Sequence, residues 1–406
     1  MPGSKGLDQR LLTPDFFVDP YPIYRQLREQ DPVHWSDAWN CWVLTRYRDV
    51  VATMHDRRLS NRRIPSYLEE LPGKVRREVR PLVDHISSWL GFCDPPQHTR
   101  LRKLVSPAFT RRLTGNMRPR IQKLVDTLID SVAPAGQMDI VHDFAYPLPV
   151  TVICELIGIP ARDQDRFKDW SEDVVAFLGT GRAQSGSTLH AQQSLLEMAD
   201  YFRPLMARRR RSPREDLLSD LVRGEEGDQI DPQELLGMCV SLLIAGHQTT
   251  THLLGNSVLA LLRNPEQLET LRKRPSLIVG AVEELLRYDG PVQRNWRLAT
   301  EDLEIRHRRI KKGQLILQML GAANRDPAEF TNPDPDRLEI TRHPNRHVAF
   351  GYGMHYCLGA PLARLEGQIA IDTLIRRLPD LSLQDENLEW HKNMAFRSLR
   401  SLPVVF

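Results

Sequence analysis

Residues 350–359 of the chain read Phe350-Gly351-Tyr352-Gly353-Met354-His355-Tyr356-Cys357-Leu358-Gly359, and a run with helical periodicity follows directly. Glycine lets a backbone adopt positive φ and approach a flat ligand closely. The helix start after Cys357 offers free N–H groups and a positive dipole end, which favour thiolate over thiol. This arrangement is what an axial haem ligand requires. A buried structural cysteine in a glycine-rich turn is the alternative.

The composition is that of an ordinary soluble globular protein. The 406 residues include 55 Lys+Arg and 52 Asp+Glu, a net charge of +3, and 41% are hydrophobic. Disorder, collagen-like repetition and a membrane bundle are excluded. The small net charge gives no argument for nucleic acid. Because the chain shows neither a signal-peptide layout nor about 18 uncharged residues in a row, we expect a cytoplasmic protein that does not bind a membrane.

The cysteines and the main run of positive charge are otherwise unremarkable in pattern. Five cysteines, odd in number and without CxxC spacing, indicate neither a disulfide framework nor a zinc site. We expect four of them, Cys41, Cys93, Cys154 and Cys239, to pack as small apolar residues. The four arginines at 208–211 predict the solvated end of a helix, with a nucleic-acid address as the alternative.

Hydrophobic periodicity predicts a mainly helical protein with small β-sheets. Alternating runs at 32–36 and 41–45 favour an antiparallel sheet near the N-terminus, and short strands return between 290 and 350. Helices are predicted over 118–132, 143–157, 188–211, 231–263, 266–288 and 359–378. No low-complexity linker separates these parts, so residues 1–406 are expected to form a single domain.

The helix predicted over 231–263 contains a local conflict. Asp231, Pro232 and Glu234 form a capping-box start, and the first half is apolar enough to be buried. Its middle, residues 245–251, nevertheless combines a glycine with three threonines, which are poor helix formers. Such a conflict indicates either a groove in the helix where a small ligand sits or a notch for close helix packing.

At these motifs the sequence resembles the cytochrome P450 family over nearly its full length. Residues 350–359 are similar to the Phe-Gly-x-Gly-x-His-x-Cys-x-Gly signature, Glu284 to Arg287 to the Glu-x-x-Arg motif, and Ala245 to Thr250 to the oxygen-groove motif. Residues 94–102 resemble the His-x-x-x-Arg segment of the bacterial members. The resemblance implies the cytochrome P450 fold, with a long central helix over a buried haem b.

The resemblance also implies roles for individual residues. Cys357 would be the iron ligand within a cofactor-binding frame that includes Phe350, Gly351 and Gly359. The haem propionates would be neutralised by charge-assisted hydrogen bonds from His98, Arg102, Arg297 and His355. The oxygen groove would comprise Ala245, Gly246, Gln248 and Thr249. An architectural ion-pair network would join Glu284, Arg287 and Arg337.

Gln248 departs from the family pattern, which usually has Asp or Glu before the groove threonine. A carboxamide cannot pass through an anionic form and so cannot relay protons as an acid does. Thr249 with ordered water could deliver protons alone, and this is the reading we favour. Alternatively, His247 or another route substitutes, or the enzyme uses peroxide or catalyses something other than ordinary hydroxylation.

Two segments without acidic residues suggest how electrons arrive. Residues 95–125 carry eight lysines and arginines, namely Arg100, Arg102, Lys103, Arg111, Arg112, Arg118, Arg120 and Lys123, and residues 340–365 carry Arg342, Arg346 and Arg364. The resemblance places both segments on the face beneath the cysteine. We expect a positive patch that suits an acidic ferredoxin served by a ferredoxin reductase, with ordinary solvated charge as the alternative. Nothing in the sequence suggests more than a monomer.

By family position the substrate pocket should be apolar and aromatic. Its expected lining is Trp89, Leu90, Phe92, Phe177, Leu178, Leu243, Val292, Arg294, Asn295, Trp296, Met394 and Phe396. Arg294 could meet a substrate carboxylate, lie at the surface or contact a propionate. The predicted function is a haem-thiolate monooxygenase of secondary metabolism that hydroxylates or epoxidises a polyketide, macrolide, terpenoid or fatty-acid-like molecule. A peroxide-dependent or non-oxygenating haem-thiolate enzyme, and a haem carrier or sensor without turnover, are the alternatives.

Overall fold

The computed structural model describes residues 2–68, 71–115, 117–180, 185–227, 229–394 and 396–406, except for the side chains of residues 2–5, 108, 110–115, 180, 185, 187 and 226. Its contacts divide the chain into two compact units. Unit 1 contains residues 1–59, 118–148 and 249–406, and unit 2 contains residues 60–117 and 149–248. That residues 1–406 form one domain stays a prediction.

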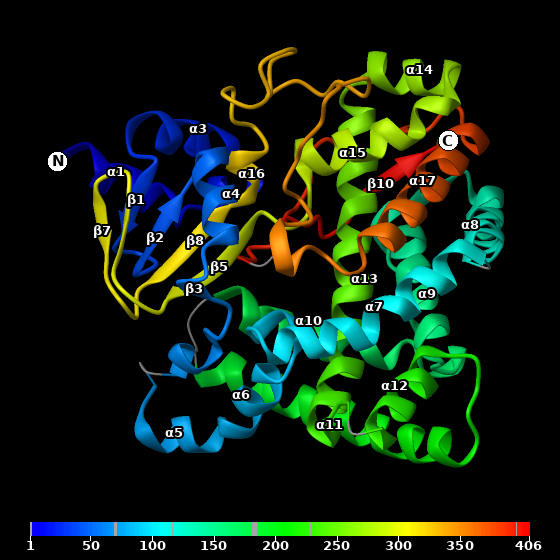
Figure 1. The fold of residues 1–406 in the computed structure, drawn as a ribbon. Helices are drawn as coiled ribbons and strands as arrows, with labels where there is room; N and C mark the ends of the chain where they lie inside the picture. Colours follow the sequence, from blue (N-terminus) through cyan, green and yellow to red (C-terminus); the bar gives the residue numbers. More distant parts are fainter. Residues whose placement is uncertain (1, 69–70, 116, 181–184, 228, 395) are drawn as a thin grey trace. The chain divides into compact units, whose positions relative to one another are not determined.

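Unit 1 is built around a five-stranded sheet with the order β1-β2-β8-β5-β3 (Figure 1). The strands β1 and β2 pair antiparallel, with Val33 opposite Leu44, which confirms the sheet predicted near the N-terminus. The strand β8 runs parallel to β2 and antiparallel to β5. The bounds are β1 Val33–Ser36, β2 Cys41–Leu44, β3 Leu59–Ser60, β5 Arg294–Ala299 and β8 Leu315–Met319.

The two faces of this sheet are covered by different apolar clusters. On one face Trp296, Leu317 and Met319 pack with side chains of α1 (Pro2–Arg10), α2 (Pro14–Val18) and α3 (Tyr21–Gln30). On the other face Ala299 and Ile316 pack with α4 (Tyr47–His55), α16 (Leu320–Ala323) and the segment around residue 348. Successive strand residues point to opposite faces, so the central strands β2, β8 and β5 contribute to both clusters.

The remaining elements of unit 1 follow the predicted pattern with one difference. The predicted helices 118–132 and 359–378 are confirmed as α8 (Met117–Val132) and α17 (Ala360–Arg377). The single helix predicted over 266–288 is wrong, because the chain forms α14 (Pro265–Lys273) and α15 (Ile278–Asp289) on either side of Pro275, which has no N–H to donate and disfavours helical backbone before it. The small sheets comprise β4 (Gln137–Asp139), β10 (Pro403–Val405) and β9 (Ser382–Leu383), and β6 (Leu303–Ile305) with β7 (Arg308–Ile310).

A buried ion-pair network in unit 1 corrects one predicted residue. The Arg287 side chain donates from Nε and Nη2 to the Glu284 carboxylate at 2.7 and 2.8 Å. The second guanidinium on that carboxylate comes from Arg342, whose Nε lies 3.2 Å from both oxygens. The predicted Arg337 has an exposed side chain and contributes only its carbonyl, which accepts from Arg287 Nη2 at 3.1 Å.

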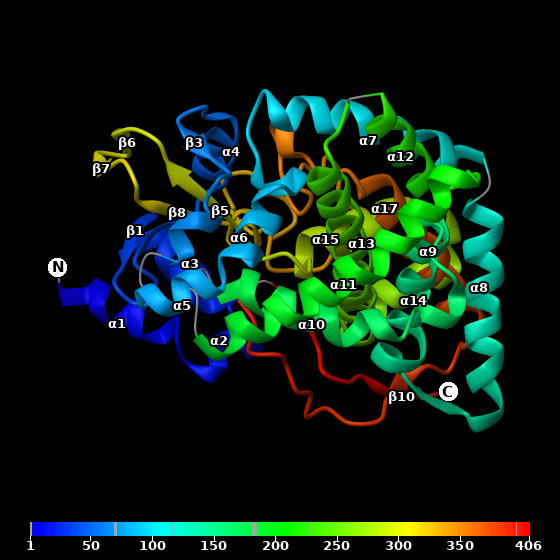
Figure 2. The ribbon, with the colours of Figure 1, turned by 90° about the horizontal axis from the view of Figure 1, so that it is seen from below.

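Unit 2 is helical in the part of the chain that the structure describes. Its helices are α5 (Gly73–Glu78), α6 (Arg80–Ser87), α7 (Gln97–Gly115), α10 (Arg166–Thr180), α11 (Ser185–Arg211) and α12 (Leu217–Glu226). Figure 2 shows α10 and α11 side by side, with the Phe167 and Tyr201 rings 5.1 Å apart. The helix predicted over 188–211 is confirmed. Its arginine run is not uniformly solvated, because Arg209 is buried and its Nε donates to Asp216 at 2.6 Å.

The longest helix in the described part of the chain is α13 (Pro232–Leu262), of 31 residues, which confirms the helix predicted over 231–263 to within one residue at each end. Asp231 Oδ1 accepts from the backbone N–H groups of Gln233 and Glu234 at 2.9 Å, and Asp231 N–H donates to Glu234 Oε2 at 3.1 Å, which confirms the capping box. The helix predicted over 143–157 is divided in the structure. Residues Ile140–Ala145 form a π-helical turn, and α9 (Pro147–Ile157) follows it. Ile140–Ile157 is apolar enough to cross a membrane, but 67% of it is buried, as in the core of a soluble protein.

Candidate active site

The cysteine loop before α17 is shaped by its glycines. Gly351 and Gly353 have φ values of +72° and +71°, where a side chain would be strained. The Cys357 N–H donates to the Phe350 carbonyl at 2.9 Å, which closes the loop. A Cβ on Gly359 would lie 4.0 Å from Cys357 Sγ, and one on Gly353 would lie 3.3 Å from Nδ1 of His55 at the end of α4. The loop therefore packs closely against the end of α4 at Gly353, and Gly359 adds no side chain next to the cysteine sulfur.

Exposure distinguishes Cys357 from the other cysteines. All five are described, and Cys357 is the one that is partly exposed, whereas the other four are buried as predicted. Burial raises the pKa of the Cys93 thiol to about 11 and those of Cys154 and Cys239 to about 12. Those three remain neutral thiols at physiological pH, and thiolate is the form that binds iron.

Side chains alternate between the two faces of β5, so the predicted site residues of this strand lie on different faces. Asn295 and Arg297 share the face of Ala299, which packs in the same cluster as Met54 and Val348. The cysteine loop also contacts the end of α4, so Arg297 lies on the cysteine side of the sheet. Arg297 is 3% exposed, and its Nη1 donates to the Trp296 carbonyl at 2.9 Å. His355 lies within the cysteine loop and is partly exposed.

Arg294 and Trp296 lie on the opposite face of β5. Trp296 belongs to the cluster formed with α1, α2 and α3, and the Arg294 guanidinium lies 5.0 Å from the Phe16 ring. The structure therefore does not bring these two residues together with Asn295 and Arg297. Their prediction as lining of one pocket next to the cofactor missed the period of two in the strand.

In unit 2, His98 and Arg102 lie one turn apart on α7. His98 is 3% exposed, and its backbone N–H donates to the Asp94 carbonyl at 2.9 Å. Burial, followed by the charge of Arg102, lowers the pKa of His98. This part of α7 presents a neutral imidazole beside a permanently charged guanidinium, and both groups can donate hydrogen bonds to a carboxylate.

The centre of α13 supports both interpretations of its poor helix formers. A Cβ on Gly246 would lie 2.6 Å from Ile153 Cγ1 of α9, so the glycine permits close packing. On the same helix Ala245 is exposed and Thr249 is partly exposed, although the neighbouring Gln248 is buried. Residues 245 and 249 are one turn apart and share a face. The packing notch and the open face are therefore adjacent features of one helix.

The comparison with known proteins identifies the family. The cytochrome P450 family description matches residues 74–396. The chain belongs to the cytochrome P450 family. It is 40% identical over 395 residues to the biotin biosynthesis cytochrome P450 of Bacillus subtilis, with 97% of each chain covered. It is 38% identical over 403 residues to the 6-deoxyerythronolide B hydroxylase of Saccharopolyspora erythraea, with 96% of each chain covered.

Solved structures confirm the predicted fold. P450BioI, in complex with an acyl carrier protein ligated to hexadec-9Z-enoic acid, matches with a TM-score of 0.89 at 39% identity, covering 97% of this chain and 99% of that chain. CalO2 matches with the same TM-score at 36% identity, covering 98% of each chain. The protein is a haem-thiolate monooxygenase that binds haem b through a cysteine thiolate, as the family does.

The described residues of this cytochrome P450 fit haem. Cys357 is a partly exposed cysteine in a glycine-framed loop, as an axial thiolate needs. Buried or partly buried nitrogen donors occur in both units, at Arg297 in unit 1 and at His98 and Arg102 in unit 2. When bound, the haem supplies the redox chemistry by which the family activates dioxygen.

The predicted substrate residues of this cytochrome P450 form a partial aromatic cluster in unit 2. The ring of Trp89 lies 6.0 Å from that of Phe92, and the Arg63 guanidinium lies 4.6 Å from the Phe92 ring. Arg63 Nε donates to Tyr67 Oη at 2.9 Å, and the Tyr67 ring lies 6.2 Å from that of Phe177. No local sequence pattern predicts Arg63 and Tyr67 as members of this cluster. The predicted Leu90 and Leu243 are buried, and Leu178 is partly buried.

The other predicted substrate residues lie in unit 1. Val292 forms an isolated bridge with Phe396, whose ring lies 5.5 Å from that of His252 on α13. The Met394 carbonyl accepts from Arg294 Nη1 at 2.9 Å. Phe396 therefore contacts the central helix three residues after Thr249, whereas Met394 is held by Arg294.

Ion pairs reduce the predicted basic patch. Arg342 pairs with Glu284, Arg364 Nε donates to Glu283 at 2.6 Å, and Arg100 pairs with Glu234 at 2.6 Å. Exposed cations remain at Lys103 in unit 2 and at Arg118, Arg120, Lys123 and Arg346 in unit 1. The side chains of Arg111 and Arg112 lie outside the described residues. A segment without acidic residues does not by itself predict free positive charge, because its arginines form ion pairs with carboxylates from other segments.

Proposed function

We propose that Cys357 is the haem ligand of this monooxygenase and that the enzyme inserts one oxygen atom of dioxygen into a lipophilic small molecule by hydroxylation or epoxidation. The observation that carries this proposal is the partial exposure of Cys357 in a glycine-framed loop, whereas the other four cysteines are buried. The helix α17 begins three residues after the sulfur, and its N-terminal dipole stabilises the thiolate.

The propionate partners are proposed to be His98, Arg102, Arg297 and His355. Two carboxylates of a buried macrocycle must be paired or hydrogen-bonded, because an uncompensated buried charge costs several kcal/mol. Arg297 is buried on the cysteine side of the sheet, and His98 is buried next to the charge of Arg102. The two arginines would supply positive charge, and the two histidines would supply hydrogen bonds.

The substrate is proposed to be a polyketide, macrolide, terpenoid or fatty-acid-like molecule. The cluster around Trp89, Phe92 and Phe177 offers apolar and aromatic surface. Similar proteins include the 6-deoxyerythronolide B hydroxylase and a polyketide biosynthesis cytochrome P450 of Bacillus subtilis, and P450BioI carries an acyl carrier protein ligated to a fatty acid. These names fit a role in secondary metabolism.

Substitution of the cysteine tests the haem assignment. Cys357→Ser should abolish the absorbance shift that carbon monoxide produces with reduced thiolate-ligated haem, and with it substrate oxidation. The matched variant Cys239→Ser replaces a buried thiol and should retain both, with a lower melting temperature. Retention of the thiolate-type carbon monoxide spectrum by Cys357→Ser would overturn the assignment.

Electrons are proposed to come from an acidic ferredoxin served by a ferredoxin reductase. On the cysteine loop Tyr352 and Met354 are 45% and 44% exposed, and Arg346 is an exposed cation shortly before the loop. Exposed apolar side chains beside a cation suit a partner with an acidic rim. We further propose that the protein is cytoplasmic and monomeric.

Proton delivery is proposed to depend on Thr249 and ordered water. Gln248 is buried and cannot ionise. His247 fits the alternative route poorly, because its Nδ1 lies 2.8 Å from the Leu243 carbonyl and burial lowers its pKa to about 4. At physiological pH this imidazole is neutral and its Nδ1 proton is donated to that carbonyl. Thr249 is partly exposed on the open face of α13 and can hold a proton at Oγ1.

A further inference from the structure

One side chain, that of Arg364 on α17, joins the cysteine loop to the helix α15. Its Nε and Nη2 donate to the two carboxylate oxygens of Glu283 at 2.6 and 2.7 Å. Its Nη1 donates to the hydroxyl oxygen of Tyr356 at 2.9 Å, and its Cζ lies 4.5 Å from the centre of the Phe350 ring. All three nitrogens of this guanidinium therefore contact protein groups.

The two aromatic residues that contact Arg364 lie on either side of the bond that closes the cysteine loop. The Phe350 carbonyl accepts from the Cys357 N–H at 2.9 Å. That N–H belongs to the peptide bond between Tyr356 and Cys357. The rings of Phe350 and Tyr356 lie 6.3 Å apart. Both partners of the closing hydrogen bond thus belong to residues whose side chains Arg364 contacts.

Glu283 is itself held in place from the start of the loop. The His347 Nε2 lies 3.0 Å from Glu283 Oε2, and the Ala349 N–H donates to His347 Nδ1 at 3.2 Å. The imidazole therefore has its proton on Nε2 and donates it to the carboxylate. Burial raises the pKa of Glu283, but hydrogen bonds from Arg364 and His347 outweigh burial and lower it to about 2. The carboxylate is ionised at physiological pH, and its paired bonds with Arg364 are of the strong, charge-assisted kind.

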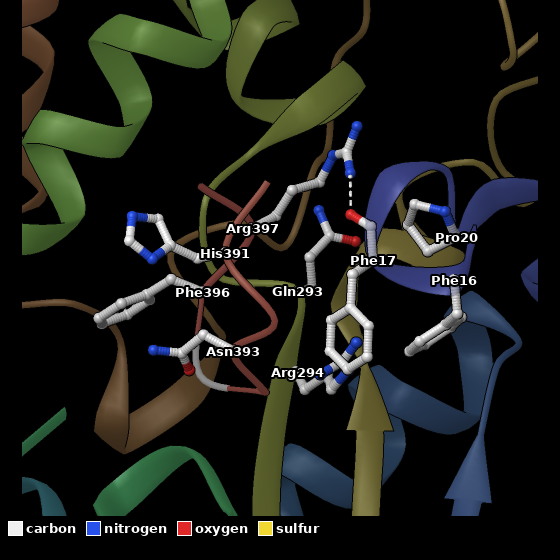
Figure 3. Close-up of a pocket in the computed structure, with 9 residues that line it drawn as sticks. All are labelled: Phe16, Phe17, Pro20, Gln293, Arg294, His391, Asn393, Phe396 and Arg397. Carbon is white, nitrogen blue, oxygen red and sulfur yellow. Dashed lines mark hydrogen bonds between the residues drawn. The ribbon is translucent and has the colours of Figure 1, made fainter. Parts of the chain in front are cut away.

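A second arginine of unit 1 makes the same combination of contacts away from the cysteine loop. Arg397 Nε donates to Asp289 at the end of α15 at 2.5 Å, and its Nη1 donates to the Phe17 carbonyl at 3.1 Å, as Figure 3 shows. Its Cζ lies 3.7 Å from the centre of the Trp390 ring. A carboxylate, an oxygen acceptor and an aromatic ring fix each guanidinium in one orientation. Arg397 joins α15 to the end of α2, whereas Arg364 joins α15 to the cysteine loop.

We propose that Arg364 is a positioning residue for Cys357. By holding Phe350 and Tyr356 it preserves the hydrogen bond that closes the loop, so the backbone of the cysteine keeps one conformation. The backbone conformation determines which side-chain rotamers are allowed, and groups around a metal ligand orient that ligand. This inference rests on the proposed role of Cys357 as the haem ligand, to which it adds the residue that orients the sulfur.

Amide hydrogen exchange of the holoenzyme, followed by mass spectrometry, tests the proposal. Tyr356→Phe removes one hydroxyl and keeps the ring, and Arg364→Gln removes the guanidinium. In peptides covering residues 350–358 Tyr356→Phe should exchange about tenfold faster than wild type, which is the effect of one hydrogen bond to a charged group. Arg364→Gln should exchange at least as fast as Tyr356→Phe, because the loop opens locally without unfolding of the protein.

The spectrum of the reduced carbon monoxide complex gives a second readout, because it reports the thiolate. On warming, Tyr356→Phe and Arg364→Gln should lose the thiolate-type spectrum about tenfold faster than wild type. Arg364→Lys keeps the positive charge but lacks the planar fork of donors, so it should also lose the spectrum faster than wild type. Wild-type behaviour of Arg364→Lys in both measurements would overturn the role of the guanidinium.

The matched control is Arg376→Gln, because Arg376 is an exposed arginine of the same helix that pairs with Asp372 at 3.5 Å. It should leave the loop exchange and the spectrum at the wild-type values. Wild-type loop exchange in Tyr356→Phe and Arg364→Gln would overturn the proposal. Exchange that rises equally in α8 would also overturn it, because such a change reports a general loss of stability.

The haem assignment is tested separately in the same samples. Absence of the thiolate-type spectrum in wild type would count against Cys357 as the ligand, and the exchange measurement would still show whether Arg364 holds the loop. Unchanged loop exchange in the variants, with a thiolate-type spectrum in wild type, would remove only the role of Arg364. The proposed monooxygenase function would then stand.

Discussion

Burial of single residues determines which groups near the centre of α13 can exchange protons. Gln248 is 7% exposed and stands where the family usually has an acid. Substitution Gln248→Glu should therefore raise the product formed per electron consumed. A positioned general acid contributes about 10²- to 10⁴-fold, so even a poorly placed carboxyl should accelerate the proton-dependent step about tenfold.

The measurement is the ratio of product formed to NADPH oxidised, with a surrogate ferredoxin and reductase supplying the electrons. Thr249→Ala should change the ratio in the opposite direction, because it removes the hydroxyl that holds the proton. If Gln248→Glu leaves both the ratio and the rate of oxygen uptake at the wild-type values, Gln248 has no part in proton delivery.

A second residue, Glu366 on α17, links burial to pH dependence. It is 1% exposed, its Oε2 has no hydrogen-bond partner among the described residues, and burial raises its pKa well above the ordinary value of 4.5. The folded protein thus keeps this carboxyl protonated at pH values where the unfolded chain has released the proton. The free energy of unfolding therefore falls as pH rises above about 4.5.

Glu366→Gln removes this cost without changing the shape of the side chain. The melting temperature of the variant should exceed that of wild type by an amount that grows from pH 5 to pH 8, reaching a few degrees. Glu386→Gln, which replaces a surface carboxylate, should show no such trend. A difference between Glu366→Gln and wild type that is the same at both pH values would contradict the interpretation.

At the scale of elements, α13 can pack closely on α9 because Gly246 has no side chain. A Cβ at Gly246 would lie 2.6 Å from Cγ1 and 2.7 Å from Cδ1 of Ile153. Gly246→Ala gains about 1 kcal/mol of helix propensity, but overpacking typically costs about 1–3 kcal/mol. We expect a net loss of unfolding free energy, measured by denaturant titration.

The double variant Gly246→Ala with Ile153→Ala separates packing from propensity. Ile153→Ala alone should destabilise by about 2–5 kcal/mol because it leaves a cavity. In the double variant the new methyl group enters that space, so the two effects should be less than additive by at least about 0.5 kcal/mol. Strict additivity would show that Gly246 and Ile153 do not contact each other.

For the whole molecule, the sequence predicted features that depend on local chemistry and missed those that depend on distant partners. The capping box at Asp231 and the glycine frame of Cys357 follow from neighbouring residues, and both are present. The helix predicted over 266–288 is an exception, because Pro275 is a local signal for the break between α14 and α15. Two ion pairs were not predicted, because they join distant segments that no local pattern connects. Arg342, and not the predicted Arg337, pairs with Glu284, and Arg364 pairs with Glu283. The face of the sheet on which Arg294 lies could be assigned only from the register of β5 with β8.

The charge of the whole molecule bears on the last prediction. A net charge of +3 is too small to attract a partner over a long range. Steering of an acidic ferredoxin must therefore come from local cations such as the exposed Arg346 before the cysteine loop. Their effect should be screened once the Debye length falls below about 10 Å, near 0.1 M salt.

The rate of the first electron transfer, followed by stopped-flow spectroscopy, should fall about tenfold between low and high ionic strength, the lower end of electrostatic rate enhancements. Arg346→Gln should lower the rate at low salt and weaken the salt dependence. Arg309→Gln removes an exposed charge, paired with Asp302, from the β6–β7 hairpin and should leave both unchanged. A salt-independent rate in wild type would mean that the contact around Tyr352 and Met354 is apolar in character, and that the donor is not recognised by its charge.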